Sequence, residues 1–217
     1  MRNELEKLMQ TVAAGAAATA SHTGIAEFDP RVLAAMREVL RHEFVPESSL
    51  SLAYVDVPLP IGHGQTISQP YIVALMTHLL ALKPGDHTLE VGGGSGYQAA
   101  IMGQLANEVH TVEIVPALAR ACRERLARLG VHNVFVHEGD GTLGLPEKAP
   151  FDAILVAAAA REVPPALIEQ LKPGGRMVIP VGEVDTVQSL QLLQKDLHGN
   201  YIEHNLLPVR FVPLIGS

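Results

Sequence analysis

From residue 88 onward the chain repeats one pattern, in which a short apolar run is followed by a segment with apolar residues at helical spacing. The apolar runs predict strands at 88–91, 109–112, 134–137, 153–156 and 176–180. The segments between them predict helices at 97–106, 116–129 and 164–171. Strands that alternate with helices are typical of a mostly parallel sheet with helices on both faces. We therefore predict a doubly wound α/β fold.

The two ends of the chain depart from this alternation. Before residue 88 the pattern predicts helices at 4–12, 30–41 and 71–82, and Asp29 followed by Pro30 is a typical helix start. The first two helices form an N-terminal helical cap, and the small-residue run 13–20 is interpreted as a linker or a frayed helix end. Near the other end, strand-like stretches at 189–195 and 205–212 flank the turn His198-Gly199-Asn200, which predicts a C-terminal antiparallel strand pair.

The segment 54–70 reads YVDVPLPIGHGQTISQP and contains three prolines and two glycines. This composition predicts an ordered irregular loop. Neither an internal repeat nor a domain boundary is visible, and 217 residues are enough for one substantial core. We therefore expect a single domain over 1–217, with the helical cap and this loop at 1–70 and the α/β core at 71–217.

Charge and composition narrow the possible functions. The formal net charge of −7 argues against nucleic-acid binding, which normally requires a basic face. No apolar run approaches the roughly 20 residues that cross a bilayer, so no membrane segment is expected. Cys122, the one cysteine, has no intramolecular disulfide partner, which indicates a reducing compartment, and a cytoplasmic location is therefore expected. A monomer is the default expectation. The ten histidines form no pair or cluster with zinc-like spacing, so no metal is expected.

The predicted strand at 88–91 runs into a glycine-rich loop, and the sequence from Leu89 to Tyr97 reads LEVGGGSGY. A phosphate-cradling loop would require a lysine after its last glycine, and here Tyr97 follows Gly96. The dinucleotide pattern G-x-G-x-x-[GA] can be matched only from Gly94 to Ala99, which is a poor fit. A nucleoside-like cofactor without phosphate remains, and S-adenosylmethionine meets that description.

Two acidic residues are predicted to lie beside this loop. Glu113 ends the next predicted strand, about twenty residues after the glycines, where a carboxylate can accept hydrogen bonds from ribose hydroxyls. Asp140 follows the predicted strand at 134–137 on the same edge of the sheet, in a position to face the adenine. Either carboxylate could instead be a solvated loop charge, but three features in register favour a cofactor site.

Several motifs together resemble the protein-L-isoaspartate O-methyltransferase family. The resemblance extends over roughly residues 29–214. The motifs read PLPIGHGQTISQP, LEVGGGSGYQAA, VEI, EGDG, PFDAILVAAA, LIEQLKPGGRMVIPVG and RFVPL. GQTISQP is much more specific than the glycine loop, which many methyltransferases share. The resemblance implies a Rossmann-like methyltransferase fold and a loop at 54–70 that receives the methyl acceptor. It implies methyl transfer from S-adenosyl-L-methionine to the free carboxylate of L-isoaspartyl residues in damaged proteins or peptides, with S-adenosyl-L-homocysteine as product and repair through a succinimide.

The resemblance also implies roles for individual residues. In this family the serine of the ISQP element, here Ser68, is regarded as the active-site residue, and its hydroxyl can orient the acceptor carboxylate. Because a carboxylate is already a nucleophile near neutral pH, no strong base is needed. From the residues alone, Ser68 could equally cap the following helix, and Ile67 and Val212 could belong to the core. The residues expected at the acceptor are Thr66, Ile67, Gln69 and Val212, and those expected at the cofactor are Glu90, Gly92, Gly94, Gly96, Glu113, Asp140 and Gly141.

Two departures from the family pattern keep other functions open. The family loop usually has a hydroxyl where this chain has Gly93, and a later strand often ends VTAA where this chain has Ala157. One alternative is a paralogue that methylates ordinary aspartate in a peptide product or a small carboxylic acid. Another is a non-catalytic module that binds S-adenosylmethionine as a sensor or recruits a partner, although the intact GQTISQP argues against it. His63 lies between two glycines and is interpreted as a surface loop residue.

Overall fold

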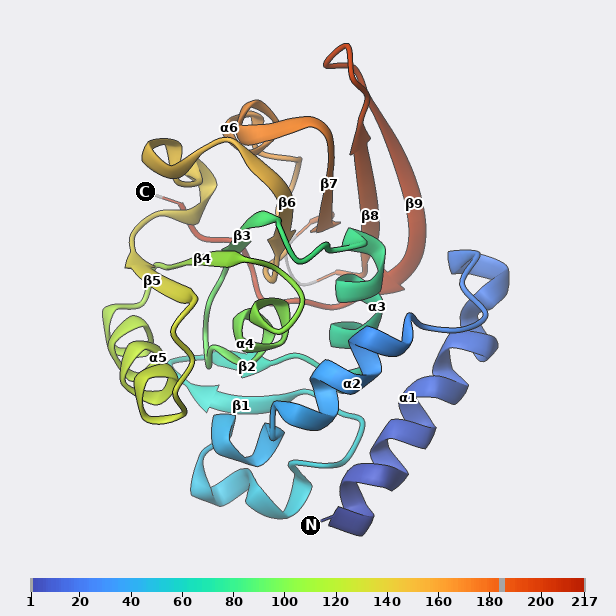
Figure 1. The fold of residues 1–217 in the computed structure, drawn as a ribbon, viewed down its shortest axis with the longest axis vertical. Helices are drawn as coiled ribbons and strands as arrows, with labels where there is room; N and C mark the ends of the chain where they lie inside the picture. The colour runs from blue at the N-terminus through green and yellow to red at the C-terminus, as the bar shows by residue number, and fades with distance from the viewer. Residues whose placement is uncertain (1, 184–185, 217) are drawn as a thin grey trace.

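A central sheet organises the molecule (Figure 1). The computed structural model describes residues 2–183 and 186–216, so residues 1 and 217, the ends of the expected domain, lie outside it. Within these ranges the main sheet has seven strands in the order β5-β4-β3-β6-β7-β8-β9. The parallel strands are β3 (His87–Val91), β4 (Glu108–Glu113), β5 (Val134–Glu138), β6 (Phe151–Val156) and β7 (Leu171–Val181). The antiparallel strands β8 (Gln188–Lys195) and β9 (Tyr201–Val209) complete the sheet and confirm the predicted fold class.

Helices cover both faces of this sheet because alternate strand residues point to opposite sides. One face is covered by α3 (Pro70–Leu80), α4 (Tyr97–Gly103) and α5 (Pro116–Arg128). The other is covered by α6 (Pro165–Gln170) and by the short 3-10 helices η3 (Gly141–Leu143) and η4 (Pro146–Lys148). The neighbouring residues Ile154 and Leu155 of β6 accordingly belong to two different apolar cores.

The first helix is longer than predicted. α1 (Arg2–Thr23) continues through the small-residue run 13–20, so the interpretation of this run as a linker or a frayed helix end was wrong. Alanine has the highest intrinsic helix propensity, which favours continuation of the helix. Leu8, Val12 and Ala16 are buried at a spacing of one helical turn, and they direct one face of α1 toward the core.

The alanine-rich part of α1 packs tightly on α3. A Cβ added to Gly15 would lie 2.5 Å from Cδ2 of the Tyr71 ring, so only glycine allows this approach. One turn later, Thr19 Oγ1 lies 2.5 Å from the Tyr71 hydroxyl. The small residues therefore form the surface through which α1 contacts α3.

The remaining part of the N-terminal cap follows the prediction more closely. α2 (Pro30–Glu38) begins as predicted, with Asp29 Oδ1 accepting the backbone N–H of Arg31 at 2.8 Å. It ends before the predicted residue 41 because Val39 already has extended backbone. Two short 3-10 helices follow, η1 (Arg41–Phe44) and η2 (Glu47–Leu52).

The segment predicted as an irregular loop contains a β-hairpin, so that prediction was wrong for residues 59–67. β1 (Leu59–Gly62) and β2 (Gln65–Ile67) pair antiparallel outside the main sheet (Figure 1). The turn is made by Gly62, His63 and Gly64, which have φ values of 92°, 54° and 72°. The prolines in this segment argued against a strand, but a two-stranded sheet consists of edges, where proline is tolerated.

The C-terminal strand pair is confirmed, although β9 begins and ends earlier than predicted. Asp196 closes the turn between β8 and β9 by accepting the backbone N–H groups of His198 and Asn200. After β9 the chain returns to the end of β6. There the Ala159 N–H donates to the Val212 carbonyl at 2.8 Å, and the Leu214 N–H donates to the Ala159 carbonyl at 2.8 Å. The tail is thus fixed beside the carboxyl end of a central strand.

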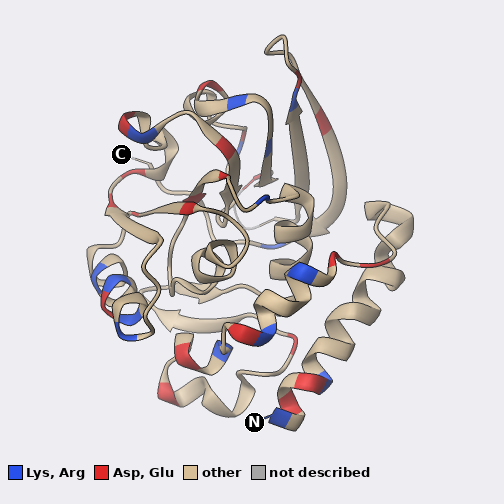
Figure 2. Ribbon diagram, viewed as in Figure 1, with Lys and Arg blue, Asp and Glu red and all other residues tan. Residues whose placement is uncertain are grey.

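Several basic residues gather on α5 (Figure 2). Arg120 and Arg128 of this helix are exposed, whereas Cys122 and Leu126 are buried against the sheet. The basic cluster is therefore the solvated side of an amphipathic helix. Within the described residues, no helix combines the length and apolar character required to cross a bilayer.

Candidate active site

The parallel strands bring the predicted site residues to one edge of the sheet. Val91 is in register with Val112 and with Val156 on its two neighbouring strands. The glycine loop after β3, Glu113 at the end of β4 and Ala157 after β6 consequently lie side by side. In open α/β sheets, ligands bind outside the carboxyl ends of the strands, which is this edge.

Glu113 holds the glycine loop in place. Gly92, Gly94 and Gly96 have positive φ values of 91°, 49° and 85°, which favour glycine. Glu113 Oε2 accepts the backbone N–H of Gly94 at 2.7 Å, and Oε1 accepts that of Val115 at 2.8 Å. The carboxylate is buried beneath the loop and also lines the adjoining cavity. Its contact with a ribose stays a prediction.

Glu90, near the end of β3, is buried under the same loop. Burial is the main cause that raises the pKa of this carboxyl to about 8. The negative charge of the neighbouring Glu113 raises this pKa further. The hydrogen bond from Thr111 and, to a smaller extent, the backbone of Ala99 lower it. Thr111 Oγ1 donates to Glu90 Oε2 at 2.5 Å, while Oε1 has no hydrogen bond of normal geometry among the described residues. Because Glu90 lines the cavity, this oxygen can receive a donor group of a ligand.

The departure at Gly93 has a local explanation. Gly93 lacks the positive φ of its neighbours, so its backbone is compatible with a side chain. A Cβ at this position would lie 2.6 Å from Thr111 Oγ1, the hydroxyl that bonds to Glu90. In this chain, Thr111 from the adjacent strand fills the space beside Glu90 that a side chain at position 93 would enter.

A first cavity opens at this edge, and most of the predicted cofactor residues line it. They are Glu90, Gly92, Gly94, Glu113 and Gly141. Gly96 and Asp140 are not among the described residues of its lining. A Cβ on Gly96 would lie 2.7 Å from Cys122 Sγ, so this glycine allows α5 to pack closely. Asp140 Oδ1 accepts the backbone N–H of Thr142 and caps η3. Contacts of Gly96 and Asp140 with a cofactor stay predictions.

A second cavity, of about 400 Å³, lies beside the first. Among the described residues, the two cavities share only Thr66, Ser68, Ala157 and Val212. Of the other predicted acceptor residues, Ile67 lines the first cavity and Gln69 lines the second. Ser68 therefore lies at the boundary between two cavities, the first of which is lined by most of the predicted cofactor residues.

Arg41 positions Ser68 and was missed by the sequence analysis. Its side chain is buried, and Nη1 donates to the Ser68 carbonyl oxygen at 2.8 Å while Nη2 donates to the Val57 carbonyl oxygen at 3.1 Å. The guanidinium also lies 5.3 Å from the centre of the Tyr97 ring, a cation–π contact. Nothing in the sequence around Arg41 distinguishes it from a surface arginine.

Asp56, rather than Ser68, caps α3. Asp56 Oδ1 accepts the backbone N–H of Tyr71 at 2.8 Å, and Oδ2 accepts Nε2 of Gln69 at 2.9 Å. The side chain of Ser68 is half-buried and makes no hydrogen bond to another described residue. The capping role that the sequence left open for Ser68 is therefore not observed, and its hydroxyl is available to a ligand.

Two further contacts fix the glycine loop from outside the sheet. A Cβ on Gly94 would lie 3.2 Å from Cδ1 of Ile61, which places the hairpin directly over the loop. Arg125 Nη1 of α5 donates to the Ser95 carbonyl oxygen at 2.8 Å. His63 lies at the exposed turn of the hairpin, which confirms its interpretation as a surface residue.

Comparison with known proteins identifies relatives over almost the whole chain. A family model described as protein-L-isoaspartate(D-aspartate) O-methyltransferase matches residues 19–217. The protein-L-isoaspartate O-methyltransferase 1 of Cupriavidus necator is 56% identical over 210 residues, which cover 97% of this chain and 81% of that protein. A solved protein-L-isoaspartate O-methyltransferase is similar with a TM-score of 0.84 and 31% identity, covering 97% of this chain and 66% of that chain. A Plasmodium falciparum structure assigned to the same enzyme class, in complex with S-adenosyl-L-homocysteine, has a TM-score of 0.78 and 28% identity, covering 98% and 99%.

Proposed function

The chain belongs to the protein-L-isoaspartate(D-aspartate) O-methyltransferase family, and we propose from this premise that it methylates the free carboxylate of L-isoaspartyl residues in damaged proteins and peptides. S-adenosyl-L-methionine supplies an activated methyl group, and S-adenosyl-L-homocysteine is released. The ester then closes to a succinimide without further catalysis. The observation that carries this proposal is that the two cavities meet at Ser68, Thr66, Ala157 and Val212.

The residues of the first cavity fit the cofactor. The glycines of the loop at 92–94 expose backbone without side chains to the cavity. Gly141 also lines the cavity, and it must be small because a Cβ there would lie 2.4 Å from Cγ1 of Val91. Glu90 has one buried oxygen without a normal hydrogen bond, which suits the ammonium group of the methionine part. Glu113 suits the ribose hydroxyls, and Asp140 is proposed for the adenine side. We propose that these residues hold S-adenosyl-L-methionine, with Gly92 and Gly94 in backbone contact and Gly96 in support.

The acceptor needs orientation more than activation. Its carboxylate is ionised near neutral pH and is therefore a competent nucleophile without a general base. We assign the Ser68 hydroxyl to donate a hydrogen bond to one carboxylate oxygen, which directs the other oxygen toward the methyl group. Arg41 fixes the Ser68 backbone, and Asp56 fixes the start of α3. Alignment of two reactants can contribute roughly 7–11 kcal/mol to the reduction of a barrier.

The neighbours of Ser68 define the rest of the acceptor site. Thr66 and Val212 line both cavities. Gln69 lines the second cavity, and a hydrogen bond from its Nε2 to Asp56 holds its side chain in place. Ile67 is buried and lines the first cavity. We propose that the substrate backbone lies along the second cavity between the loop at 66–69 and the C-terminal tail, so that only the acceptor carboxylate reaches the boundary at Ser68.

The decisive experiment compares two peptides that differ only in the linkage of one residue. The protein is incubated with S-adenosyl-L-methionine and with either the isoaspartyl or the aspartyl peptide, and methyl ester and succinimide are followed by mass spectrometry. Methylation of the isoaspartyl peptide alone supports the proposal. Methylation of the aspartyl peptide favours the paralogue, and cofactor binding without turnover on either peptide favours the sensor.

The role of Ser68 has its own test. Ser68→Ala should lower turnover on the order of 100-fold, the effect of losing a positioned donor, with little change in cofactor affinity measured by calorimetry. Ser48→Ala, at an exposed position of η2, is the matched control and should keep full activity. Unchanged turnover in Ser68→Ala would remove this residue from the catalytic site.

We also propose that the enzyme is a cytoplasmic monomer that acts on protein substrates and binds neither nucleic acid nor a membrane. The net charge of −7 supports the exclusion of nucleic acid, and the buried thiol of Cys122 agrees with a reducing compartment. Light scattering coupled to size-exclusion chromatography tests the monomer, and a dimer mass would overturn it.

A further inference from the structure

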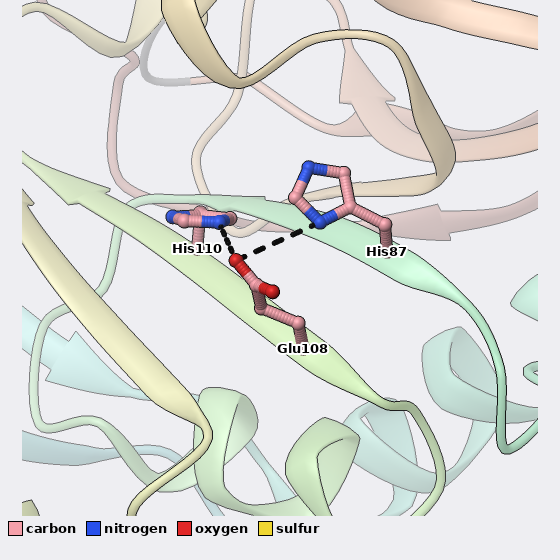
Figure 3. Close-up of side chains that lie close together, drawn as sticks. All are labelled: His87, Glu108 and His110. Carbon is pink, nitrogen blue, oxygen red and sulfur yellow. Dashed lines mark hydrogen bonds and ion pairs between the residues drawn. The ribbon is translucent and has the colours of Figure 1, made fainter.

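A second cluster of polar side chains lies at the opposite edge of the sheet, where β3 and β4 begin (Figure 3). His87 and Glu108 are register partners on the two strands, and His110 follows Glu108 on the same face of β4. One ligand atom from each of the three lies within 4.8 Å of the other two. Glu108 Oε1 is 2.5 Å from His110 Nε2 and 3.8 Å from His87 Nδ1.

The hydrogen bond on the far side of His87 leaves Nδ1 available as a ligand. Its Nε2 lies 2.7 Å from the Lys148 carbonyl oxygen, which can only accept, so Nε2 carries the proton. In the neutral imidazole the lone pair is then on Nδ1, the atom that faces Glu108 (Figure 3). The ring also stacks on Phe151, with centroids 4.9 Å apart and an interplanar angle of 13°. A carbonyl and an aromatic ring thus hold this imidazole in a ligand orientation.

His110 is supported in the same way by its second nitrogen. Its Nδ1 lies 2.8 Å from His137 Nε2 and can donate to it when Nε2 binds a ligand. The ring is buried and stacks on Phe135, with centroids 5.3 Å apart.

We propose that His87, Glu108 and His110 bind one divalent transition-metal ion, and that Zn²⁺ is the ion that fits best. Two neutral imidazoles and one carboxylate are an established zinc ligand set, with water in the fourth position. Mg²⁺ and Ca²⁺ prefer sites made of oxygen ligands. Donor atoms around a tetrahedral Zn²⁺ are about 3.4 Å apart, so Glu108 must move away from His110 by roughly 1 Å. Its side chain is 35% exposed and has room for this movement.

The site is separate from the methyl-transfer chemistry. It lies at the start of β3, about 13 Å along the strand from the glycine loop at its other end. A bound ion would join the first residues of β3 and β4 and stabilise the sheet. The spacing of the histidines gave no sign of this site, because His87 meets the other two ligands only through strand pairing.

The test is a calorimetric titration of the full chain with zinc chloride after metal removal with a chelator and dialysis. We expect one equivalent of zinc to bind, with affinity reduced roughly 100-fold or more in His87→Gln and in Glu108→Gln. Both substitutions replace partly exposed side chains, so folding should be preserved. His22→Gln, at an exposed position of α1, is the matched control and should bind zinc like the unmodified protein.

A second probe reports the ligand geometry. Cobalt chloride should produce the intense visible absorption of four-coordinate Co²⁺ in the unmodified protein and in His22→Gln, but not in His87→Gln. Zinc binding that is equal in all variants would place the ion elsewhere and overturn the proposal, as would the lack of a one-equivalent transition at micromolar zinc. Because methyl transfer is not the readout, failure of the repair assay and failure of this site remain distinguishable.

Discussion

Arg41 donates a hydrogen bond from Nη1 to the main-chain carbonyl oxygen of Ser68 at 2.8 Å. The same guanidinium reaches the Val57 carbonyl through Nη2, so one buried side chain joins the two ends of the segment that carries the hairpin. Burial is the main cause that lowers the pKa of Arg41, and the neighbouring Tyr97 and Asp56 oppose this shift. A buried cation that binds the backbone of the proposed catalytic serine is a positioning device.

Arg41→Lys should separate positioning from charge. A lysine keeps the charge but lacks the planar fork that serves two carbonyls at once. We expect turnover to fall about tenfold or more with little change in cofactor affinity, and the free energy of unfolding to fall by about 1.5–3 kcal/mol. Kinetics, calorimetry and chemical denaturation measure the three quantities. Arg37→Lys, at an exposed ion pair with Glu6, is the control, and equal turnover in both variants would contradict the positioning role.

Glu90 should make the unbound protein less stable at alkaline pH. Because the folded-state pKa is raised to about 8 from an ordinary value of 4.5, the folded protein holds a proton that the unfolded chain releases. The contribution of this proton to the free energy of unfolding is fully present below pH 4.5 and is lost as the pH rises through 8. The total loss is up to roughly 5 kcal/mol. Denaturation at a series of pH values should show this decline, and Glu90→Gln should flatten it. The exposed Glu162→Gln should retain the decline; a flat profile in the unmodified protein would refute the buried acid.

Cofactor binding should release a proton from the same residue. A cation placed beside Glu90 lowers its pKa, so a carboxyl that is mostly protonated at pH 7 becomes ionised in the complex. Calorimetric titrations with S-adenosyl-L-methionine in buffers of different ionisation enthalpy should give different apparent enthalpies. The dependence on buffer should disappear in Glu90→Gln, and its persistence there would assign the proton to another group.

Gly93 and Thr111 should be energetically coupled. Gly93→Thr places a side chain where the Thr111 hydroxyl now lies, and the hydrogen bond to Glu90 is then lost or strained. We expect a loss of about 1–3 kcal/mol in the free energy of unfolding. Adding Thr111→Ala removes the competing hydroxyl, so the double variant should lose less than the sum of the two single ones. A double-mutant cycle by chemical denaturation measures this difference, and additive losses would argue against the contact.

Gly15→Ala should destabilise the protein although helix propensity favours the change. Propensity alone predicts a gain of about 1 kcal/mol, but the new methyl group would lie 2.5 Å from the Tyr71 ring. We expect a net loss of about 1–3 kcal/mol from overpacking between α1 and α3. Ala14→Gly, at an exposed position one residue earlier, should lose about 1 kcal/mol through propensity alone. A rise in melting temperature for Gly15→Ala would show that the two helices separate easily.

The hydrophobic pattern was sufficient to predict the order of strands and helices from β3 to β8. Strands and helices bury apolar residues at different spacings along the chain. Each element can therefore be recognised from its own segment of sequence. The start of α2 at Pro30 and the turn before β9 were predicted for the same reason, since capping and turn residues act on their immediate neighbours. The motif at 58–70 indicated the residues that we propose for the acceptor site. Its hairpin was missed because proline is excluded from central strands but not from edges.

Contacts between distant segments were decided only by the tertiary structure. The bond from Arg41 to Ser68, the cap that Asp56 provides to α3 and the pairing of Thr111 with Glu90 each join residues from different elements. The cluster of His87 with Glu108 likewise exists only because β3 and β4 pair in one register. The sequence by itself determined which elements form and which cofactor suits the loop between them. Which side chains meet depends on strand order, register and burial, and these properties arise when the whole chain packs.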